Sequence, residues 1–147
     1  MKEKTYVMVK PGFADNPQVI KYVKQRLKQA GLTINEESYI CYDESHAKQH
    51  YVDHVLKSFY PELEQYITSS PAYGMIVTGE NAISTIRAMA GATKNPEEGT
   101  IRYEVPKMLN LPIRVTENVV HSSDSVEAAQ REIAIFEDLV NNNTKTV

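Results

Sequence analysis

The sequence predicts an α/β sandwich in which helices pack against one sheet, and three observations lead to this fold class. Short runs rich in apolar and β-branched residues alternate with longer segments whose apolar residues recur at helical spacing. The chain has 147 residues, of which 41% are hydrophobic and 24% charged, and this suits one globular domain with its own core. Because no repeat or linker interrupts it, we expect a single domain over residues 1–140 and a polar tail at 141–147.

The first three predicted elements are a strand, a helix and a second strand. Residues 4–10 are rich in β-forming side chains and lead into Pro-Gly, which predicts a strand followed by a loop. Asn16 is a candidate N-cap, Pro17 suits the first helical position, and Gly31 suits the end of the helix. Residues 32–42 return to an apolar pattern that indicates a strand.

The middle of the chain is predicted to hold two helices, a buried strand and a further helix. Ser45 is a candidate cap for the first helix, and a short second helix is expected after Pro61. Residues 73–78 are apolar, as in a central strand that is buried on both faces. A stripe at helical spacing then predicts a helix over 81–90, with Gly91 just past its end.

The last third is predicted to contain a long loop, a strand and a final helix. Residues 93–112 have no sustained period and contain three prolines, so we expect a loop, and loops this long are usually functional or disordered. Strand character returns over 113–120. The sequence Asp-Ser-Val-Glu at 124–127 resembles a capping box that opens a helix. From Asn141 onward the polar tail is expected to be frayed.

Composition argues against several classes of partner. The 16 Lys and Arg residues against 19 Asp and Glu give a net charge of −3, whereas a nucleic-acid-binding domain usually carries a basic stripe, so we expect no nucleic acid. The lone Cys41 rules out an intramolecular disulfide and suits a reducing compartment, so we expect a cytoplasmic protein. No apolar run approaches the roughly 18 residues of a membrane span, and the N-terminus lacks a signal peptide's apolar stretch, so we expect no membrane partner.

Three of the four histidines stand four residues apart. His46, His50 and His54 share one stripe of a predicted helix. A zinc-protease motif requires a glutamate after its first histidine, but Ala47 stands there. We interpret the stripe as a solvated helix face and predict no metal held by the protein.

His121 has a different setting, because it ends an apolar strand and immediately precedes a helix N-terminus. Backbone N–H groups at such a junction favour anions. Glu132, in the following helix, is well spaced to orient the imidazole and to fix which ring nitrogen carries the proton. A neutral imidazole held in this way is a competent nucleophile toward phosphorus. From position alone, a structural histidine at a strand end is the competing interpretation.

Cations and an aromatic residue elsewhere in the chain suit a polyphosphate ligand. Three cations and a hydroxyl form a candidate charge clamp, namely Lys10, Arg87, Arg102 and Thr93. Phe59 is a candidate stacking surface for a base, although an ordinary core or surface aromatic is the simpler interpretation. The sequence has neither a P-loop nor a Gly-x-Gly-x-x-Gly motif, so a nucleotide would be bound by a different design.

At these residues the sequence resembles the nucleoside diphosphate kinase family. The most specific matches are Gly99-Thr100-Ile101-Arg102 and the block His121-Ser122-Ser123-Asp124-Ser125. Further pieces follow in the family's order along nearly the whole chain, among them Tyr6-Val7-Met8-Val9-Lys10-Pro11, His50-Tyr51 and Phe59-Tyr60-Pro61-Glu62-Leu63. The resemblance implies a ferredoxin-like βαββαβ sandwich, an α+β fold with a four-stranded antiparallel sheet covered by helices. It also implies a homo-oligomer, with a hexamer favoured.

The resemblance further implies that the γ-phosphate of ATP or another NTP passes to an NDP by a ping-pong mechanism through a phosphohistidine. By position, the nucleophile corresponds to His121, and the other catalytic residues correspond to Glu132, Ser123, Lys10 and Tyr51. The nucleotide-binding residues correspond to Lys10, Phe59, Arg87, Thr93, Arg102 and Asn118. Mg²⁺ is expected to arrive with the nucleotide, bound mainly by phosphate oxygens and water.

Departures from the family pattern leave a second function open. The family's Lys-Pro-Asp-Gly reads Lys-Pro-Gly-Phe at residues 10–13, and Ser122 stands where the family has a glycine. The segment between Arg102 and His121 is also longer than usual. The alternative to an active kinase is therefore a nucleotide-binding regulatory homologue with weakened catalysis. A small nucleic-acid-binding module is a third hypothesis, and the acidic balance disfavours it.

Overall fold

The computed structural model describes residues 1–114 and 118–145, with side chains through residue 142. Its centre is one four-stranded antiparallel sheet with the strand order β2-β3-β1-β4. The strands are β1 (Lys2–Val9), β2 (Thr33–Ile40), β3 (Ala72–Glu80) and β4 (Val120–Ser122). The predicted antiparallel sheet covered by helices is therefore confirmed.

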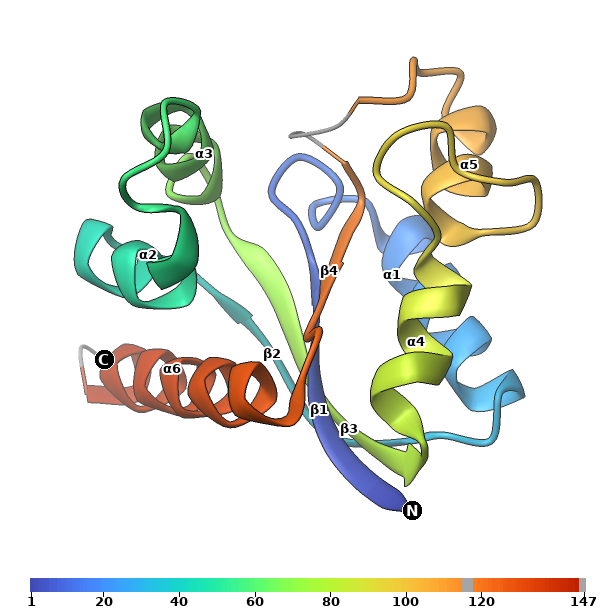
Figure 1. Cartoon of the computed structure of the whole chain (residues 1–147), viewed down its shortest axis with the longest axis horizontal. Coiled ribbons are helices and arrows are strands. Elements are labelled where there is room, and N and C mark those ends of the chain that lie inside the picture. The colour runs from blue at the N-terminus through green and yellow to red at the C-terminus, as the bar shows by residue number, and fades with distance from the viewer. Residues whose placement is uncertain (115–117, 146–147) are drawn as a thin grey trace.

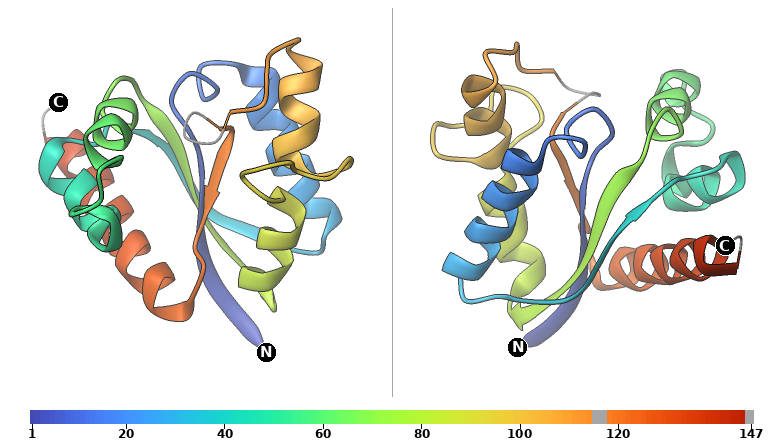
Figure 2. Two further views of the ribbon diagram at one scale, coloured as in Figure 1. Left: turned by 45° about the horizontal axis from the view of Figure 1, so that its top comes forward. Right: turned by 180° about the vertical axis from the view of Figure 1, so that it is seen from behind.

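Helices cover both faces of this sheet (Figure 1). One face carries α1 (Pro17–Gln29), α4 (Ala82–Ala90) and α5 (Ile101–Met108), and the other carries α2 (Glu44–His50), α3 (Tyr60–Ile67) and α6 (Val126–Lys145). The two views of Figure 2 show the same separation into layers. None of the helices among the described residues is long and apolar enough to cross a membrane.

The two cores arise from the alternation of side chains along β1. Val7 and Val9 point into the core beneath α1, α4 and α5, whereas Tyr6 and Met8 point into the core beneath α2, α3 and α6. All four side chains are at most 1% exposed. Because β1 is buried on both faces, it anchors the neighbouring strand β4, which pairs with it through Val7, Met8 and Val9.

The capping residue predicted from the sequence is confirmed at the start of α1, but different residues cap α2 and α6. Asn16 Oδ1 accepts from the backbone N–H of Gln18, and Pro17 opens α1, as predicted. The predicted cap Ser45 is wrong, because Asp43 caps α2 by accepting from the His46 backbone N–H at 2.7 Å. For α6, the capping oxygen belongs to Ser125, which accepts from the Ala128 N–H at 3.0 Å.

The long loop predicted over 93–112 contains a helix, α5. Ile101 and Val105 lie one helical turn apart, and both are buried in the core beside α4. This burial outweighs the backbone hydrogen bond that Pro106 cannot donate inside the helix. The prediction of a loop over the whole of 93–112 is therefore wrong, because its prolines do not prevent a short amphipathic helix.

The predicted strand over 113–120 is much shorter in the structure. β4 begins at Val120, while Ile113 and Arg114 lie outside any strand and residues 115–117 lie outside the described part of the chain. The chain leaves β1 at Lys10, so β1 offers no partner for a longer β4. At the other end, α6 continues through 145 into the segment predicted as a frayed tail, and residues 146–147 lie outside the described part.

The histidine stripe is not a solvated face, and this prediction is wrong. The exposed fractions of His46 and His50 are 9% and 3%, because this face of α2 packs against α6. The His46 ring lies between two carboxylates, with Nδ1 2.7 Å from Asp43 and Nε2 2.6 Å from Asp138. Desolvation lowers the pKa of His46, but the hydrogen bonds to Asp138 and Asp43 outweigh it and raise the pKa above its ordinary value.

Candidate active site

A pocket of about 550 Å³ lies beside the edge strand β4 and is lined from α2, α4, α5 and α6 as well. This size suits a small-molecule ligand. The lining includes His50, Tyr51, Arg87, Arg102, His121 and Glu132. The pocket therefore collects chemistry-bearing residues from both helical layers.

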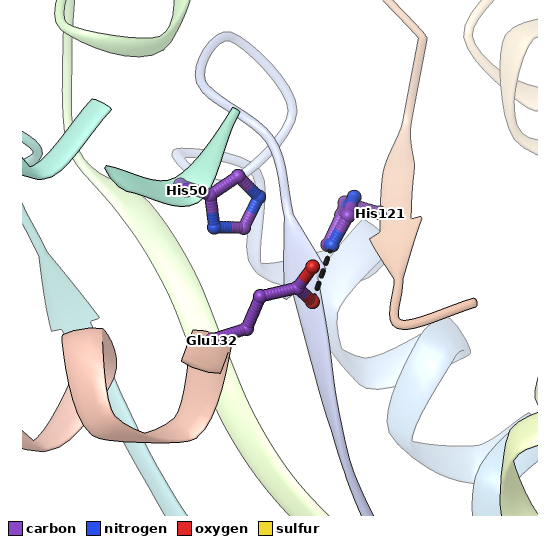
Figure 3. Close-up of side chains that lie close together, drawn as sticks. All are labelled: His50, His121 and Glu132. Atoms are coloured by element: carbon purple, nitrogen blue, oxygen red, sulfur yellow. Dashed lines mark hydrogen bonds and ion pairs between the residues drawn. The ribbon is translucent and has the colours of Figure 1, made fainter. Parts of the chain in front are cut away.

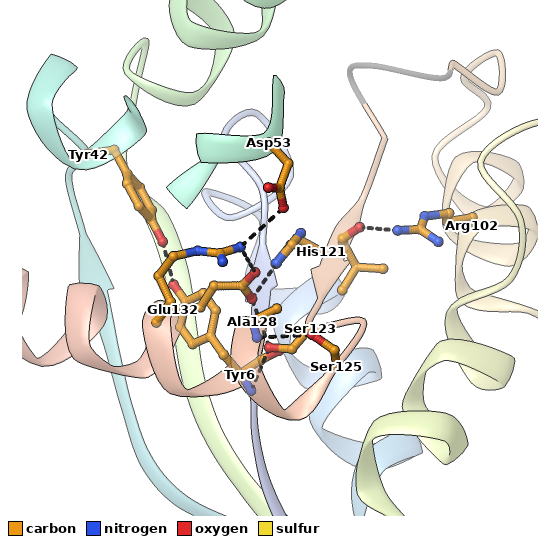
Figure 4. Close-up of polar contacts among 11 residues, drawn as sticks. Tyr6, Tyr42, Asp53, Arg102, His121, Ser123, Ser125, Ala128 and Glu132 are labelled. Carbon is orange, nitrogen blue, oxygen red and sulfur yellow. Dashed lines mark hydrogen bonds and ion pairs between the residues drawn. The ribbon is translucent and has the colours of Figure 1, made fainter. Parts of the chain in front are cut away.

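A histidine, a carboxylate and a hydroxyl form a connected chain at the base of this pocket. His121 on β4 donates from Nε2 to Glu132 Oε1 at 2.7 Å, and Ser123 Oγ donates to the same oxygen at 2.8 Å (Figure 4). The Ser123 and Glu132 side chains are buried, while 20% of the His121 side chain is exposed. Because an ionised carboxylate only accepts, Nε2 carries the proton and Nδ1 keeps its lone pair.

Three cations lie close enough to repel one another near His121. Burial, and then the charge of Arg87, lowers the pKa of Arg102 to about 10. Burial, and then the charge of Arg102, lowers the pKa of Lys10 to about 7. Like charges held together in partly buried positions favour an anion between them.

Arg102 also holds the walls of the pocket in position. Its Nη2 donates to the Val120 carbonyl at 2.8 Å, its Nε donates to Asn118 Oδ1 at 3.4 Å, and its Nη1 donates to the Gly91 carbonyl. Gly91 has φ +90°, and a Cβ there would lie 2.5 Å from Thr100 Oγ1. A glycine is therefore required where the chain leaves α4 beside Arg102.

His50 lies directly beside His121, although it comes from the other helical layer. The two ring centroids are 4.5 Å apart, and neither ring nitrogen of His50 has a hydrogen-bond partner among the described residues. Burial, and then the neighbouring His121 and Lys10, lowers the pKa of His50 well below its ordinary value. A neutral imidazole therefore faces the pocket next to the His121–Glu132 pair.

Comparison with known proteins gives this arrangement a family. A sequence model described as nucleoside diphosphate kinase matches residues 3–139. The chain belongs to the nucleoside diphosphate kinase family. It is 43% identical over 140 residues to the nucleoside diphosphate kinase of Methanosarcina mazei, covering 92% of this chain and 89% of that protein. It is 39% identical over 136 residues to the one from Treponema pallidum strain Nichols, covering 91% and 87%.

Solved structures of the family have the same fold. The nucleoside diphosphate kinase from Halobacterium salinarum, in complex with CDP, aligns with a TM-score of 0.82 at 33% identity, over 92% of this chain and 88% of that one. The Aquifex aeolicus nucleoside diphosphate kinase aligns with a TM-score of 0.76 at 27% identity, over 92% and 95%. The predicted ferredoxin-like fold of the family is confirmed.

Most of the residues carried over from the nucleoside diphosphate kinase family come together. Those that line the pocket are Tyr51, Arg87, Thr93, Arg102, His121 and Glu132. Ser123 and Asn118 join them through Glu132 and Arg102, and Lys10 is near enough to Arg102 to feel its charge. Phe59 lies outside the lining and is 47% exposed, with its ring centroid 5.6 Å from that of His54. Its stacking role stays a prediction.

Several residues that line the pocket have no role predicted from the sequence, among them His50 and Arg131. The spacing of His50 from His46 and His54 predicts a solvated stripe, although His50 directly precedes Tyr51 in a piece that matches the nucleoside diphosphate kinase family. Arg131 also lines the pocket, with Nη2 4.0 Å from both Asp53 Oδ2 and Glu132 Oε2. In the sequence, Arg131 is marked out by its place directly before Glu132, and this position alone does not predict a role in the pocket.

Proposed function

We propose that this chain moves the γ-phosphate of a nucleoside triphosphate to a nucleoside diphosphate in two steps, with His121 as the phosphate carrier. The single observation that carries this proposal is the hydrogen bond from His121 Nε2 to the buried Glu132, which leaves the Nδ1 lone pair free. His121 lines a pocket that Arg87 and Arg102 also line. Family membership supports the same activity.

In the first step the Nδ1 lone pair of His121 forms a bond to the γ-phosphorus, and the bond from phosphorus to the β,γ-bridging oxygen breaks. The nucleoside diphosphate leaves with that electron pair. In the second step a terminal β-phosphate oxygen of another diphosphate attacks the phosphorus, and the P–N bond breaks. The imidazole becomes cationic as it is phosphorylated, and Glu132 stabilises it through the Nε2 proton.

The cations supply most of the catalysis that phosphoryl transfer needs from a protein. Charge on the transferring group spreads over its equatorial oxygens, so positioning and electrostatic stabilisation dominate. Arg87 and Arg102 both line the pocket and repel one another, and the charge of Arg102 also acts on Lys10. A phosphate between them relieves the repulsion that lowers the pKa values of Arg102 and Lys10.

Mg²⁺ fits this site as a partner of the nucleotide rather than as a resident ion. Within residues 1–114 and 118–142, three His, Cys, Asp or Glu side chains that could share a metal ion come together at His50, His121 and Glu132, and two of the three are imidazoles. Mg²⁺ prefers oxygen ligands and keeps several waters. Bound to the phosphate oxygens, it supplies charge neutralisation during transfer.

The regulatory alternative is not favoured. Its motivation was the missing Asp of the Lys-Pro-Gly-Phe segment and the altered loop, but the His121–Glu132–Ser123 chain and the arginines are intact. We also propose that the protein is a cytoplasmic homo-oligomer, because Cys41 is an exposed free thiol and the family resemblance favours a hexamer.

The proposed activity is tested with γ-labelled ATP in the absence of an acceptor. The protein should become labelled with an acid-labile, base-stable phosphate, and added GDP should remove the label as GTP. Steady-state rates with ATP and GDP varied together should give parallel double-reciprocal lines, the pattern of a ping-pong mechanism. Binding of ATP with no labelling would instead support the regulatory homologue.

Nucleotide binding should take up a proton through Lys10. In the free protein its pKa is about 7, so at pH 8 it is largely neutral, and a bound polyphosphate restores its charge. ADP affinity should therefore fall as the pH rises above 7. Calorimetry at pH 8 in two buffers of different ionisation enthalpy should report uptake of up to about one proton.

The matched variants separate Lys10 from other groups. Lys10→Met should remove the proton uptake because it has no titratable group, and Lys10→Arg should remove it because arginine stays charged in both states. Uptake that persists in both variants would show that a different group titrates. The phosphates of ADP do not obscure the measurement, since their last pKa of about 6 lies well below pH 8.

A further inference from the structure

Beside the His121–Glu132 pair lies a third side chain that could coordinate a metal, His50, which the phosphoryl-transfer mechanism does not use. One atom each from His50, His121 and Glu132 lies within 4.8 Å of the other two. These residues come from α2, β4 and α6, and Figure 3 shows the three side chains converging. Two imidazoles and one carboxylate form the three-ligand set of many zinc sites that keep a fourth position open.

His50 is the residue that points to a ligand. It is 3% exposed, lines the pocket, and has no hydrogen-bond partner on either ring nitrogen among the described residues. A buried polar group without a partner is costly, and the site in front of it has room for an ion or water. Its neighbours include the rings of Tyr6 and Tyr42 at centroid distances of 6.2 and 5.4 Å, which hold the imidazole from behind.

We propose that His50, His121 and Glu132 bind one Zn²⁺ ion, with water in the fourth position. In tetrahedral zinc geometry, ligand atoms about 2.0–2.1 Å from the metal lie about 3.3 Å from one another. The His121–Glu132 pair, now at 2.7 Å, therefore opens slightly, and His50 closes by at most about 1.5 Å. His50 can turn without breaking a hydrogen bond to any described residue. As the metal binds, the His121 proton moves from Nε2 to Nδ1, so that Nε2 coordinates zinc and zinc takes the place of the N–H group as the partner of Glu132.

Charges of both signs surround the cluster, because Lys10 and Arg131 act on His50 while the Glu132 carboxylate is itself one of the proposed ligands. Arg131 Nη2 is 4.0 Å from Glu132 Oε2, but it is equally close to Asp53 Oδ2 on the far side. Asp53 and Asp124 line the same pocket and add negative charge to it. Imidazole ligands favour Zn²⁺ over Mg²⁺, and magnesium added with the nucleotide does not compete for this site.

Occupancy by zinc has a functional consequence, which rests on the proposed function. The metal takes His121 into its coordination shell and occupies the base of the phosphate pocket. The zinc-bound protein therefore does not form the phosphohistidine, and a chelator restores it. Inhibition by zinc would then be reversible and competitive with the nucleoside triphosphate.

The binding test uses Co²⁺ as a spectroscopic probe of the zinc site, with the full chain and no nucleotide. Tetrahedral Co²⁺ should produce visible ligand-field bands, and one equivalent of Zn²⁺ should remove them. His50→Phe keeps a ring in the same space but has no nitrogen ligand, and it should weaken Co²⁺ binding by at least about 10- to 100-fold. His54→Ala, which removes a histidine four residues further along the chain, should leave the bands unchanged.

A second variant, Glu132→Gln, and labelling with γ-labelled ATP distinguish failure of the zinc site from failure of the proposed phosphoryl transfer. Circular dichroism checks that His50→Phe is folded, and Glu132→Gln, which retains the shape of the side chain, should also lose the bands. Bands that persist in both variants, or that never form in the unaltered protein, overturn the proposed zinc site. If the bands form but the metal-free protein takes no label from γ-labelled ATP, the zinc site stands and the proposed phosphoryl transfer fails.

Discussion

Replacing His121 by alanine should abolish the phosphorylated intermediate and lower the rate of phosphate transfer by about 10⁴–10⁶-fold, the loss expected for a missing nucleophile. The His121 ring is the group that connects the buried Glu132 to the cation-lined pocket. Without it the γ-phosphate still meets Arg87 and Arg102, so nucleotide affinity should change much less than the rate. Labelling with γ-labelled ATP and binding of ADP measure the two effects separately.

The matched control for this variant is His54→Ala, because His54 lines the same pocket but lies outside the His121–Glu132–Ser123 chain. It should retain the label. The free energy of unfolding of His121→Ala should lie within about 1–2 kcal/mol of that of the unaltered protein, since the side chain is partly exposed and its loss removes one hydrogen bond to Glu132. An acid-labile label of undiminished intensity on His121→Ala would assign the nucleophile to another residue.

The fold was predictable where local signals agreed with packing. Asn16 and Pro17 begin α1 because a cap and a rigid first residue act within the helix itself. The helix α5 escaped prediction because Pro106 is a local signal against helix, while the burial of Ile101 and Val105 depends on packing in the core beside α4. The short β4 escaped for the same reason, since its length depends on where β1 ends.

The site residues were predictable where their positions relative to the predicted strands and helices indicated a role. His121 stood out because a strand end and a helix N-terminus flank it, and Glu132 stood out by its spacing from it. His50 could not be predicted in this way, because its burial depends on the packing of α2 against α6. The family resemblance predicted that Arg87 and Arg102 bind the nucleotide. The repulsion between the two arginines, in contrast, depends on how close the fold places them.

Replacing Arg87 by alanine should lower kcat/KM by about 10²–10³-fold, which is the loss that removal of one charge-stabilising donor causes. Arg87 sits in the last turn of α4, and its side chain is exposed and lines the pocket. Its removal also relieves the repulsion on Arg102, so the pKa of Arg102 should rise while the stability of the fold is unchanged or slightly higher.

The appropriate comparison is Arg26→Ala, because Arg26 lies on α1 outside the pocket lining and its guanidinium bonds to Tyr22 at 2.6 Å. That variant should keep full activity, which excludes a general effect of removing one positive charge. Arg87→Lys should recover only part of the loss, since an ammonium cannot form the two-point contact of a guanidinium with phosphate. If Arg87→Ala retained kcat/KM within threefold, the phosphate would not be bound between Arg87 and Arg102.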